Sequence, residues 1–299
     1  MSITKINRNG WAGPGWIILS AIGFGSVALF ARIAYADGVG ITSLLAWRFV
    51  LASLMLGPLV LARRLKLPRG RDLAGFMLLG VMYAAGAWSY FLALRYASSG
   101  LVALLVYTYP VLVAVLGAML GMDRFGRAER RAVLTCSLGL ILLLGHALTT
   151  GQPLGVALGL FSGFLYAVYI LTGSRFGHDA DPLAATWVVL TTAAVLHGAF
   201  AAFSGPSWPV STHGWLALLA MAVFSSAMAI AAFFAGLRHV GPTMASVLST
   251  LEPVVTVGLG VGFLGESLSL PNLAGSILVL CAAAGLALAR GKGQTPQPA

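Results

Sequence analysis

The feature that most constrains this chain is a set of long apolar runs without any Asp, Glu, Lys or Arg. Of its 299 residues, 59% are apolar and 9% are charged, whereas a soluble domain carries roughly 25% charged residues. A bilayer core of about 30 Å is crossed by roughly 20 apolar residues in a helix. Each run is therefore long enough for one or more membrane spans. The runs cover 11–31, 73–94, 96–122, 132–174, 182–237 and 267–289.

Dividing these runs at Gly, Pro and charge clusters predicts an all-α polytopic membrane protein with ten transmembrane helices. Lys5 and Arg8 precede the first apolar stretch, which at about 20 residues is longer than a signal-peptide core, so we interpret it as an uncleaved span. The remainder is loop, with no room for a water-soluble catalytic domain. The predicted spans are 14–35, 40–62, 73–94, 98–120, 130–148, 153–174, 182–203, 214–236, 241–264 and 269–289.

The formal net charge of +10 would suggest nucleic-acid binding in a soluble protein, but here the bases lie in short loops between spans. Fifteen fall on one side of the membrane if both termini are cytoplasmic, while Arg32 and Arg95 fall on the other and Arg48 lies within a span. This excess predicts cytoplasmic termini and contact with acidic lipid, not with nucleic acid. The fifteen are Lys5, Arg8, Arg63, Arg64, Lys66, Arg69, Arg71, Arg124, Arg127, Arg130, Arg131, Arg175, Arg238, Arg290 and Lys292.

No cofactor or metal is expected. The two cysteines, Cys136 and Cys281, both lie in apolar runs, so neither a disulfide scaffold nor a clustered zinc site is available. The glycines Gly260, Gly262 and Gly265 match a dinucleotide-binding pattern by letter. They end an apolar span, however, where that pattern requires a strand before it and a helix after it. We interpret them as helix-packing residues.

The chain repeats itself. A shift of 143 residues lays Leu94-Arg95 on Leu237-Arg238, Pro110-Val111 on Pro253-Val254, and Asp123 on Glu266. We therefore predict two five-helix units, at 14–148 and 153–289, between an N-terminal arm (1–13) and a C-terminal tail (290–299), both cytoplasmic. Because five is an odd number, the second unit must enter the membrane from the opposite face. Such an inverted repeat is a common plan of secondary transporters, with the substrate held near the midplane.

These residues resemble a known family. The pattern Leu251-Glu252-Pro253-Val254 with Gly265-Glu266, and Tyr109-Pro110 with Asp123 in the first half, is similar to the EamA family of the drug/metabolite transporter superfamily. The resemblance covers essentially the whole chain, although Asp123 stands where Glu often ends the first copy. It implies a bacterial inner-membrane protein that exports amino acids, including aromatic ones. It also implies a central cavity lined by the first, third, fourth, sixth, eighth and ninth spans.

Two charged residues within spans are candidates for substrate binding. Glu252 lies about eleven residues into its span, too deep to reach a water interface, and Arg48 lies about eight residues into the second span. Such charges cost roughly 2.5 to 3.5 kcal/mol at mid-helix on translocon scales. Glu252 could carry a proton or hold a substrate ammonium group, and Arg48 could neutralise a substrate carboxylate. The structural alternatives are a carboxylate that bonds to freed backbone groups and an arginine that extends to the interface.

Two prolines, Pro110 and Pro253, lie in the middle of equivalent spans. Each removes a backbone donor and clashes with the carbonyl four residues before it, which kinks or opens a helix. Open backbone inside a membrane is tolerated where it faces a cavity. We therefore predict that both prolines shape or gate the cavity, and the alternative is a static kink that fits the bundle.

Aromatic and hydroxyl side chains gather on the same spans. Ser246, Ser249 and Thr250 share one helix face, which we expect to point inward because polar atoms facing lipid would lack partners. An apolar pocket with a few polar groups suits a small amphipathic solute, and aromatic rings offer stacking and cation–π contacts. The aromatic candidates for the pocket are Tyr83, Trp88, Tyr107 and Tyr166. An aromatic belt at the headgroups is the alternative.

The sequence thus predicts a non-enzymatic secondary transporter that exports small amphipathic metabolites, amino acids above all, by alternating access. The expected partners are this solute and the lipid bilayer, with a homodimer through the peripheral fifth and tenth helices left open. The alternatives are a facilitative exporter, a channel for other metabolites, or an intramembrane enzyme. A channel would show rings of like residues, and an enzyme would show a nucleophile with a base or clustered metal ligands; neither pattern is visible.

Overall fold

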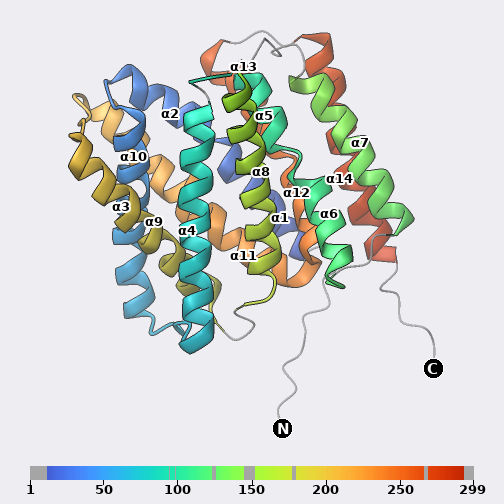
Figure 1. Cartoon of the computed structure of the whole chain (residues 1–299), viewed down its shortest axis with the longest axis horizontal. Coiled ribbons are helices and arrows are strands. Elements are labelled where there is room, and N and C mark those ends of the chain that lie inside the picture. Colours follow the sequence, from blue (N-terminus) through green and yellow to red (C-terminus); the bar gives the residue numbers. More distant parts are fainter. Residues whose placement is uncertain are drawn as a thin grey trace.

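A computed structural model gives the fold, and it describes residues 12–93, 95–97, 99–122, 126–144, 152–176, 180–265 and 269–292. The described residues form helices and connections, drawn in Figure 1. In chain order the elements are α1 (Ala12–Gly25), α2 (Val27–Ala36), α3 (Ile41–Ala62), α4 (Gly70–Ala93), α5 (Ser99–Val106), α6 (Tyr109–Met119), α7 (Arg127–Leu144), α8 (Pro153–Gly173), α9 (Pro182–Ser204), α10 (Thr212–Ala222), the π-helical segment η2 (Val223–Met228), α11 (Ala229–Val240), α12 (Pro242–Ser249), α13 (Glu252–Leu264) and α14 (Leu270–Lys292).

These elements make ten spans, numbered here in chain order, and several of the spans are interrupted. Span 1 consists of α1 and α2, span 4 of α5 and α6, span 8 of α10, η2 and α11, and span 9 of α12 and α13. In spans 4 and 9 the second helix begins one residue before a proline, Pro110 or Pro253. A proline in the first turn of a helix loses no intrahelical hydrogen bond, so the chain can restart a helix there after the break.

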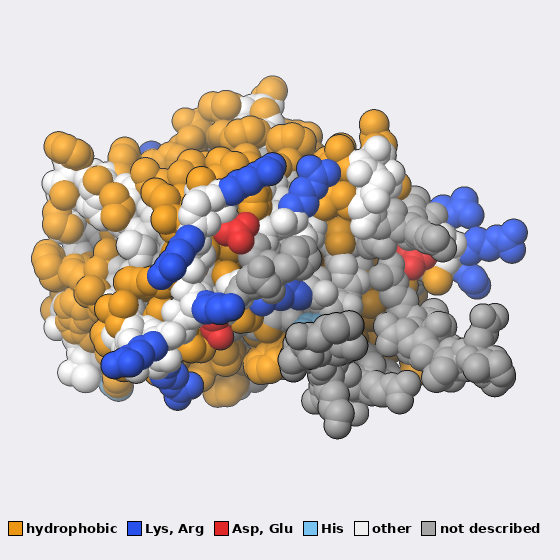
Figure 2. Space-filling model, turned by 90° about the horizontal axis from the view of Figure 1, so that it is seen from below, with side chains coloured by type: hydrophobic (Ala, Val, Ile, Leu, Met, Phe, Trp, Pro, Cys, Tyr) orange, Lys and Arg blue, Asp and Glu red, His pale blue; other side chains and the backbone are white. Residues whose placement is uncertain are grey.

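The spans run alternately between two ends of the bundle. At one end, the upper end in Figure 1, Asp37 Oδ2 accepts from the backbone nitrogens of Val210 and Ser211 at 2.8 and 2.9 Å. At the other end, the Asp181 nitrogen donates to the Lys66 carbonyl at 3.3 Å, and Arg238 donates to the Ala180 carbonyl at 2.6 Å. Figure 2 views this second end and shows Lys and Arg side chains gathered on it. We call it the basic end.

The two halves of the chain are related by an inverted repeat. Span 1 leaves the basic end, whereas span 6, which is α8, starts at the other end, where the Gln152 nitrogen donates to the Tyr96 carbonyl at 2.8 Å. Exchanging the halves maps the packed spans 3 and 6 onto spans 8 and 1, which also pack together. It maps spans 4 and 6 onto the packed spans 9 and 1. The pairs 2 with 7 and 5 with 10 map onto themselves, so they lie across the pseudo-twofold axis.

Glycines let the interrupted spans approach their neighbours at equivalent places in the two halves. A Cβ on Gly25 would lie 2.7 Å from the carbonyl oxygen of Glu252, at the break in span 9. A Cβ on Gly163 would lie 2.8 Å from the carbonyl oxygen of Val106, at the break in span 4. Both distances are too short for a real side chain. The absence of a side chain at these positions therefore lets spans 1 and 6 pack closely against the breaks in spans 9 and 4.

The prediction of an all-α polytopic fold with ten spans is confirmed. Nine helical spans in the described part of the chain are long and apolar enough to cross a membrane. The tenth, α7, is 18 residues long and begins with the charged stretch Arg127–Arg131. It packs along α14 at one edge of the bundle, where both helices expose large apolar side chains such as Leu134 and Leu280. Some predictions fall on residues outside the described ranges: residues 1–11 of the predicted arm, 293–299 of the predicted tail, Asp123 and Glu266.

Candidate functional site

A chamber of about 590 Å³ lies between the halves. This volume falls in the range of about 300 to 1,000 Å³ that is typical of small-molecule sites. Its wall is mostly apolar and aromatic, with a small number of polar side chains. The lining residues are Phe24, Val27, Ala28, Ala31, Arg32, Tyr35, Arg48, Met82, Tyr83, Gly86, Ala87, Tyr90, Phe91, Ala103, Val106, Tyr107, Tyr109, Ser162, Leu165, Tyr166, Tyr169, Glu252, Pro253, Thr256 and Val257.

Tyrosine dominates this wall. The chain has eight tyrosines, and every one except Tyr96 lines the chamber. Five of these rings form a continuous series. Their centroids are 5.8 Å apart between Tyr83 and Tyr169, 6.0 Å between Tyr169 and Tyr166, and 4.6 Å between Tyr166 and Tyr109. Tyr107 continues it at 6.0 Å from Tyr109. The wall can therefore offer both aromatic faces and hydroxyl groups to a solute.

The chamber occupies the half of the bundle away from the basic end. Span 3 begins at the basic end, and its lining residues come from its second half, Met82 to Phe91. Span 4 runs the other way, and its lining residues come from its first half, Ala103 to Tyr109. The lining therefore extends from the middle of the spans to the end that carries Tyr35, in the last turn of α2.

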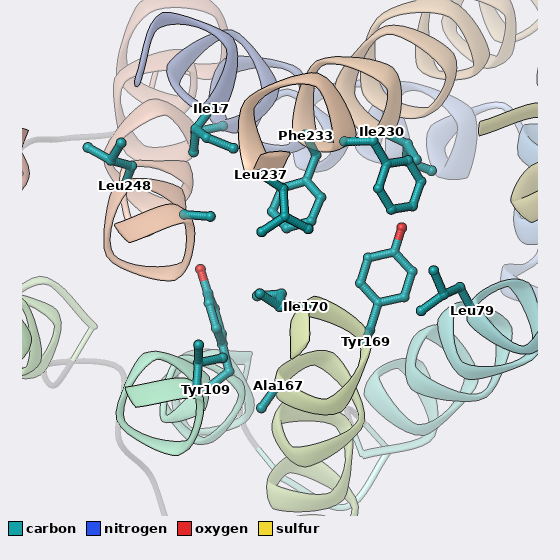
Figure 3. Packing of buried hydrophobic residues seen from close by; sticks show 14 of the residues in the cluster. Ile17, Leu79, Tyr109, Ala167, Tyr169, Ile170, Ile230, Phe233, Leu237 and Leu248 are labelled. Carbon is teal, nitrogen blue, oxygen red and sulfur yellow. The ribbon is translucent and has the colours of Figure 1, made fainter. Parts of the chain in front are cut away.

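Below the chamber, the path toward the basic end is filled by packed side chains. Figure 3 shows this region, where Tyr109 and Tyr169 face Ile17, Phe233, Leu237 and Leu248 across the bundle. All of these residues are nearly or completely buried within one hydrophobic cluster. The ring of Phe76 meets that of Phe234 edge to face at 5.4 Å. A solute in the chamber thus meets a closed core on this side.

Arg48 projects from α3 into the chamber wall and is 5% exposed. Its Nε donates to Ser226 Oγ at 2.7 Å, and its Nη2 donates to the Ser225 carbonyl at 2.9 Å and to the Tyr83 hydroxyl at 3.0 Å. No carboxylate of the described residues forms an ion pair with it. Buried charges are usually paired or fully hydrogen bonded, so Arg48 is an unusual cation. It is also held inside the bundle and does not extend to the interface.

Glu252 is the first residue of α13, where the helix dipole favours a negative charge. The Tyr107 hydroxyl donates to its Oε2 across a long 3.5 Å, and the Tyr166 hydroxyl also lies beside the carboxylate. The Thr256 hydroxyl shares its hydrogen between the Gly25 carbonyl (2.9 Å) and the Glu252 carbonyl (3.1 Å), which links the end of α1 to the start of α13. Lys and Arg side chains in the described part of the chain make no ion pair with this acid.

The structure brings together most of the residues that the sequence suggested. The chamber wall contains Arg48, Tyr83, Tyr107, Tyr166, Glu252 and Pro253. Pro110 is buried next to Tyr109 and does not line the chamber. The predicted breaks lie beside both prolines, two residues before Pro110 and two before Pro253.

Four other candidates lie elsewhere. Ser246, Ser249 and Thr250 are buried in the packed half and outside the chamber wall. Ser246 and Thr250 donate to the carbonyls of residues three positions earlier in their own helix, which satisfies their hydroxyls without a solute. Trp88 is not part of the chamber wall and packs on Phe200, with ring centroids 4.5 Å apart. The three hydroxyl-bearing residues thus lie toward the packed core and not toward the chamber.

Several residues of the site were not predicted from the sequence. Ser225 and Ser226 lie in η2, and no sequence pattern predicts its π-helical turn. Ser26 lies at the break in span 1, where its Oγ is 2.7 Å from the Oγ of Ser225. The one sequence feature that could have identified these serines is a hydroxyl group within a strongly apolar span. Span 8 was expected to line the cavity; instead its η2 segment stands behind Arg48, and the chamber wall contains none of its residues.

Metal chemistry has no ligand set in the part of the chain that the structure describes, because no three residues among His, Cys, Asp and Glu cluster there. The two cysteines are far from forming such a group: Cys136 is buried beside Thr250, and Cys281 is exposed on α14. The ionisable groups of the chamber wall are the tyrosine phenols, the guanidinium groups of Arg32 and Arg48, and the carboxylate of Glu252.

Comparison with known proteins agrees with this arrangement. The model of the EamA-like transporter family matches the chain twice, at residues 11–145 and 153–288. A solved crystal structure superposes with a TM-score of 0.81, 22% identity, and coverage of 93% of this chain and 98% of the other, which shows a shared fold.

Curated relatives carry transporter names. A protein of Archaeoglobus fulgidus named "Uncharacterized transporter" is 28% identical over 90% of this chain and 93% of its own length. The inner membrane transporter YedA of Escherichia coli K12 is 29% identical over 74% of this chain and 73% of its own. The threonine/homoserine exporter RhtA of Salmonella typhimurium is 27% identical over 90% of this chain and 89% of its own. The two family matches, one in each half of an inverted ten-span bundle, show that the chain belongs to the EamA-like transporter family.

Proposed function

We propose that this protein is a secondary transporter that exports small amphipathic metabolites, principally amino acids including aromatic ones, by alternating access. The observation that carries the proposal is the pairing of an open chamber with a closed core along one path between inverted halves. A transporter of this kind holds its solute near the midplane and exposes it to one side at a time. The chamber volume and its mostly apolar wall with few polar groups suit a single small solute.

The amino acid assignment draws on two lines of support. The exporter RhtA, a relative along most of the chain, is named for threonine and homoserine. The chamber supplies a cation, an acid and aromatic rings in one enclosure, through Arg48, Glu252 and the tyrosines. These groups complement the carboxylate, the ammonium and the side chain of an amino acid, and the rings favour aromatic side chains.

The orientation follows from the bases. Because Lys and Arg concentrate on cytoplasmic loops, we place the basic end of Figure 2 and both termini in the cytoplasm of a bacterial inner membrane. The chamber then faces outward in this structure, and the packed half closes the cytoplasmic side. Export requires a second arrangement, in which the core below Tyr109 and Tyr169 opens and the outer half closes.

The test is transport by proteoliposomes that contain the purified protein. A panel of radiolabelled amino acids, with and without a pH gradient, should show saturable movement of at least some amino acids, aromatic ones included. Replacing Tyr166 by Ala should lower this movement, whereas replacing Tyr96, the tyrosine outside the chamber wall, by Ala should leave it unchanged. The absence of movement for every amino acid in the panel would refute the substrate assignment.

Proton coupling is tested in the same vesicles. If Glu252 carries a proton, a Glu252→Gln variant should lose the response to the pH gradient while it retains exchange of solute across the membrane. Unchanged movement in this variant at every pH would favour facilitated export, the alternative in which the solute runs down its own gradient.

A further inference from the structure

We propose that Arg48 binds the carboxylate of the transported solute through its Nη1 group, and that the π-helical segment η2 holds the guanidinium in place for this purpose. The inference deepens the proposed function and rests on it, because it assigns the solute class of the same chamber. It excludes solutes without an anionic group. It also gives a role to Ser225 and Ser226, which line no part of the chamber.

The first argument is the hydrogen-bond count at Arg48. A guanidinium has five N–H donors and no acceptor. The single Nε–H and both Nη2 donors are used, by Ser226, Ser225 and Tyr83. The two Nη1 donors have no partner among the described residues, although the side chain is 95% buried and lines the chamber. An anion in the chamber can accept from both.

The second argument is the charge. The hydrogen bonds of this buried cation all go to neutral groups, and among the described residues its charge is offset only by the Phe49 ring, 5.2 Å from the guanidinium carbon, and by Glu252, with which it forms no ion pair. Such incomplete compensation is costly in a low-dielectric site. The three acceptors at Arg48 are two hydroxyls and one carbonyl. A solute carboxylate would supply the missing counter-charge. The Tyr83 hydroxyl, which accepts from Nη2, keeps its own hydrogen and can donate to the same carboxylate.

The third argument is the architecture behind Arg48. A π-helical turn is rare and occurs frequently at functional sites. Here it presents a backbone carbonyl and the next side-chain hydroxyl, from Ser225 and Ser226, to one guanidinium. Ser225 Oγ in turn lies 2.7 Å from Ser26 Oγ at the break in span 1. These contacts fix two of the three nitrogens of a side chain that lines the chamber and leave the third without a partner among the described residues, as a preorganised anion site requires.

Glu252 lies in the same wall and makes a zwitterion the best match. Its carboxylate has only phenol hydroxyls beside it, so it can accept from a solute ammonium group. Arg48 and Glu252 then face the carboxylate and the ammonium group of the solute, respectively. A solute with an amine alone would be drawn to Glu252 but would leave Arg48 uncompensated.

The decisive experiment compares isosteric ligands that differ only in the carboxylate. Proteoliposomes transporting radiolabelled L-phenylalanine are challenged with unlabelled L-phenylalanine and L-phenylalaninamide. The amide cannot form charge-assisted hydrogen bonds with Arg48, so it should compete about 10- to 100-fold more weakly than L-phenylalanine. Equal competition by the amide would overturn the inference while leaving the proposed function intact.

A binding arm keeps the inference testable even if no amino acid is transported. The melting temperature of the purified protein in detergent is measured with 3-phenylpropanoate and with its neutral isostere 3-phenylpropanamide. The carboxylate should raise the melting temperature more than the amide does, and Arg48→Gln should abolish the difference. If the amide stabilises the protein as well as the carboxylate does, Arg48 is not an anion site.

Matched variants locate the effect. Arg32 also lines the chamber, so Arg32→Gln is the control and should retain the preference for the carboxylate. Arg48→Lys keeps the charge and guards against a folding failure of Arg48→Gln; it should retain part of the preference. Ser226→Ala should raise the KM for L-phenylalanine with little change in kcat, and Ser226→Thr should restore it. Loss of the preference in Arg32→Gln but not in Arg48→Gln would refute the assignment.

Discussion

The two ends of the central path are built from equivalent helices and yet differ in content. Toward the end opposite the basic end, the later parts of spans 1 and 3 and the earlier part of span 4 enclose a chamber. The pseudo-twofold maps these onto the later parts of spans 6 and 8 and the earlier part of span 9, where Ile170, Phe233 and Leu248 are fully packed. Because equivalent helices enclose a chamber at one end and a packed core at the other, the fold alone does not determine which end is open. The open end is a property of one conformation, which alternating access would exchange for the other.

Cysteine labelling should give the largest contrast between the two ends. In a background without Cys136 and Cys281, Val27→Cys places a thiol in the chamber wall and Val247→Cys places one in the packed half, where Val247 is fully buried. A small polar maleimide should react readily with the first and leave the second intact. Comparable labelling of both, in protein whose melting temperature is unchanged, would show that the packed half is open for much of the time.

Replacing a phenylalanine by alanine should lower the free energy of unfolding by different amounts at the two ends. Phe233 is 1% exposed in the packed half, whereas Phe91 is only partly buried and borders the chamber. Phe233→Ala should cost about 3 to 5 kcal/mol of unfolding free energy, because it leaves a cavity in a close-packed core. Phe91→Ala enlarges an existing chamber and should cost clearly less. Unfolding of the purified proteins in mixed detergent and denaturant measures both, and equal losses would contradict the comparison.

A smaller effect is expected where the two ends meet, at the break in span 9. Gly25→Ala brings a Cβ to 2.7 Å from the Glu252 carbonyl and from Val255 Cβ, and such overpacking costs typically about 1 to 3 kcal/mol. Gly258→Ala, on the same helix as Glu252 but with open space around it, is the matched control. It should be neutral or slightly stabilising, because alanine favours helix. Equal melting temperatures for the two variants would contradict the prediction, because they would show that the neighbours of Gly25 can move aside at little cost.

The smallest effect concerns only the end opposite the basic end and depends on pH. The hydrogen bonds that Asp37 accepts from Ser211, followed by that from Val210, lower the pKa of its carboxyl group. A pKa that is lower in the folded state gives stability that is complete above the unfolded value of about 3.9 and is lost as pH falls through the folded pKa. Melting temperatures below about pH 4 should therefore fall more steeply for the wild type than for Asp37→Asn. Parallel curves would contradict this role.

Much of the fold was accessible from the sequence because the bilayer imposes a simple rule. Charge-free runs mark the spans, and the 143-residue shift relates Pro110 to Pro253, so the inverted halves follow from counting. The breaks at Tyr107–Thr108 and Thr250–Leu251 lie beside those prolines, where steric rules place them. The π-helical turn at Val223–Met228 has no such rule, since it depends on tertiary contacts with Arg48 and Ser26.

The site was accessible only in part, because helix periodicity gives the face of a residue but not what that face meets. Tyr107 and Glu252 were selected as polar groups in mid-span and lie together in the chamber. Ser246 was selected by the same reasoning and lies in the packed half, with its hydroxyl bonded to the Thr243 carbonyl. The two cases differ in their depth along the path, and depth matters only because one end is closed in this conformation.

The concentration of tyrosine in the chamber has a practical consequence for spectroscopy. Seven of the eight phenol rings border the chamber, whereas none of the tryptophans that the structure describes does. An optical or vibrational band specific to phenol, such as the tyrosine bands in ultraviolet resonance Raman spectra, therefore reports almost entirely on the solute's surroundings. The indole bands of the same sample report on regions outside the chamber wall and provide an internal reference, so occupancy can be followed without attaching a label.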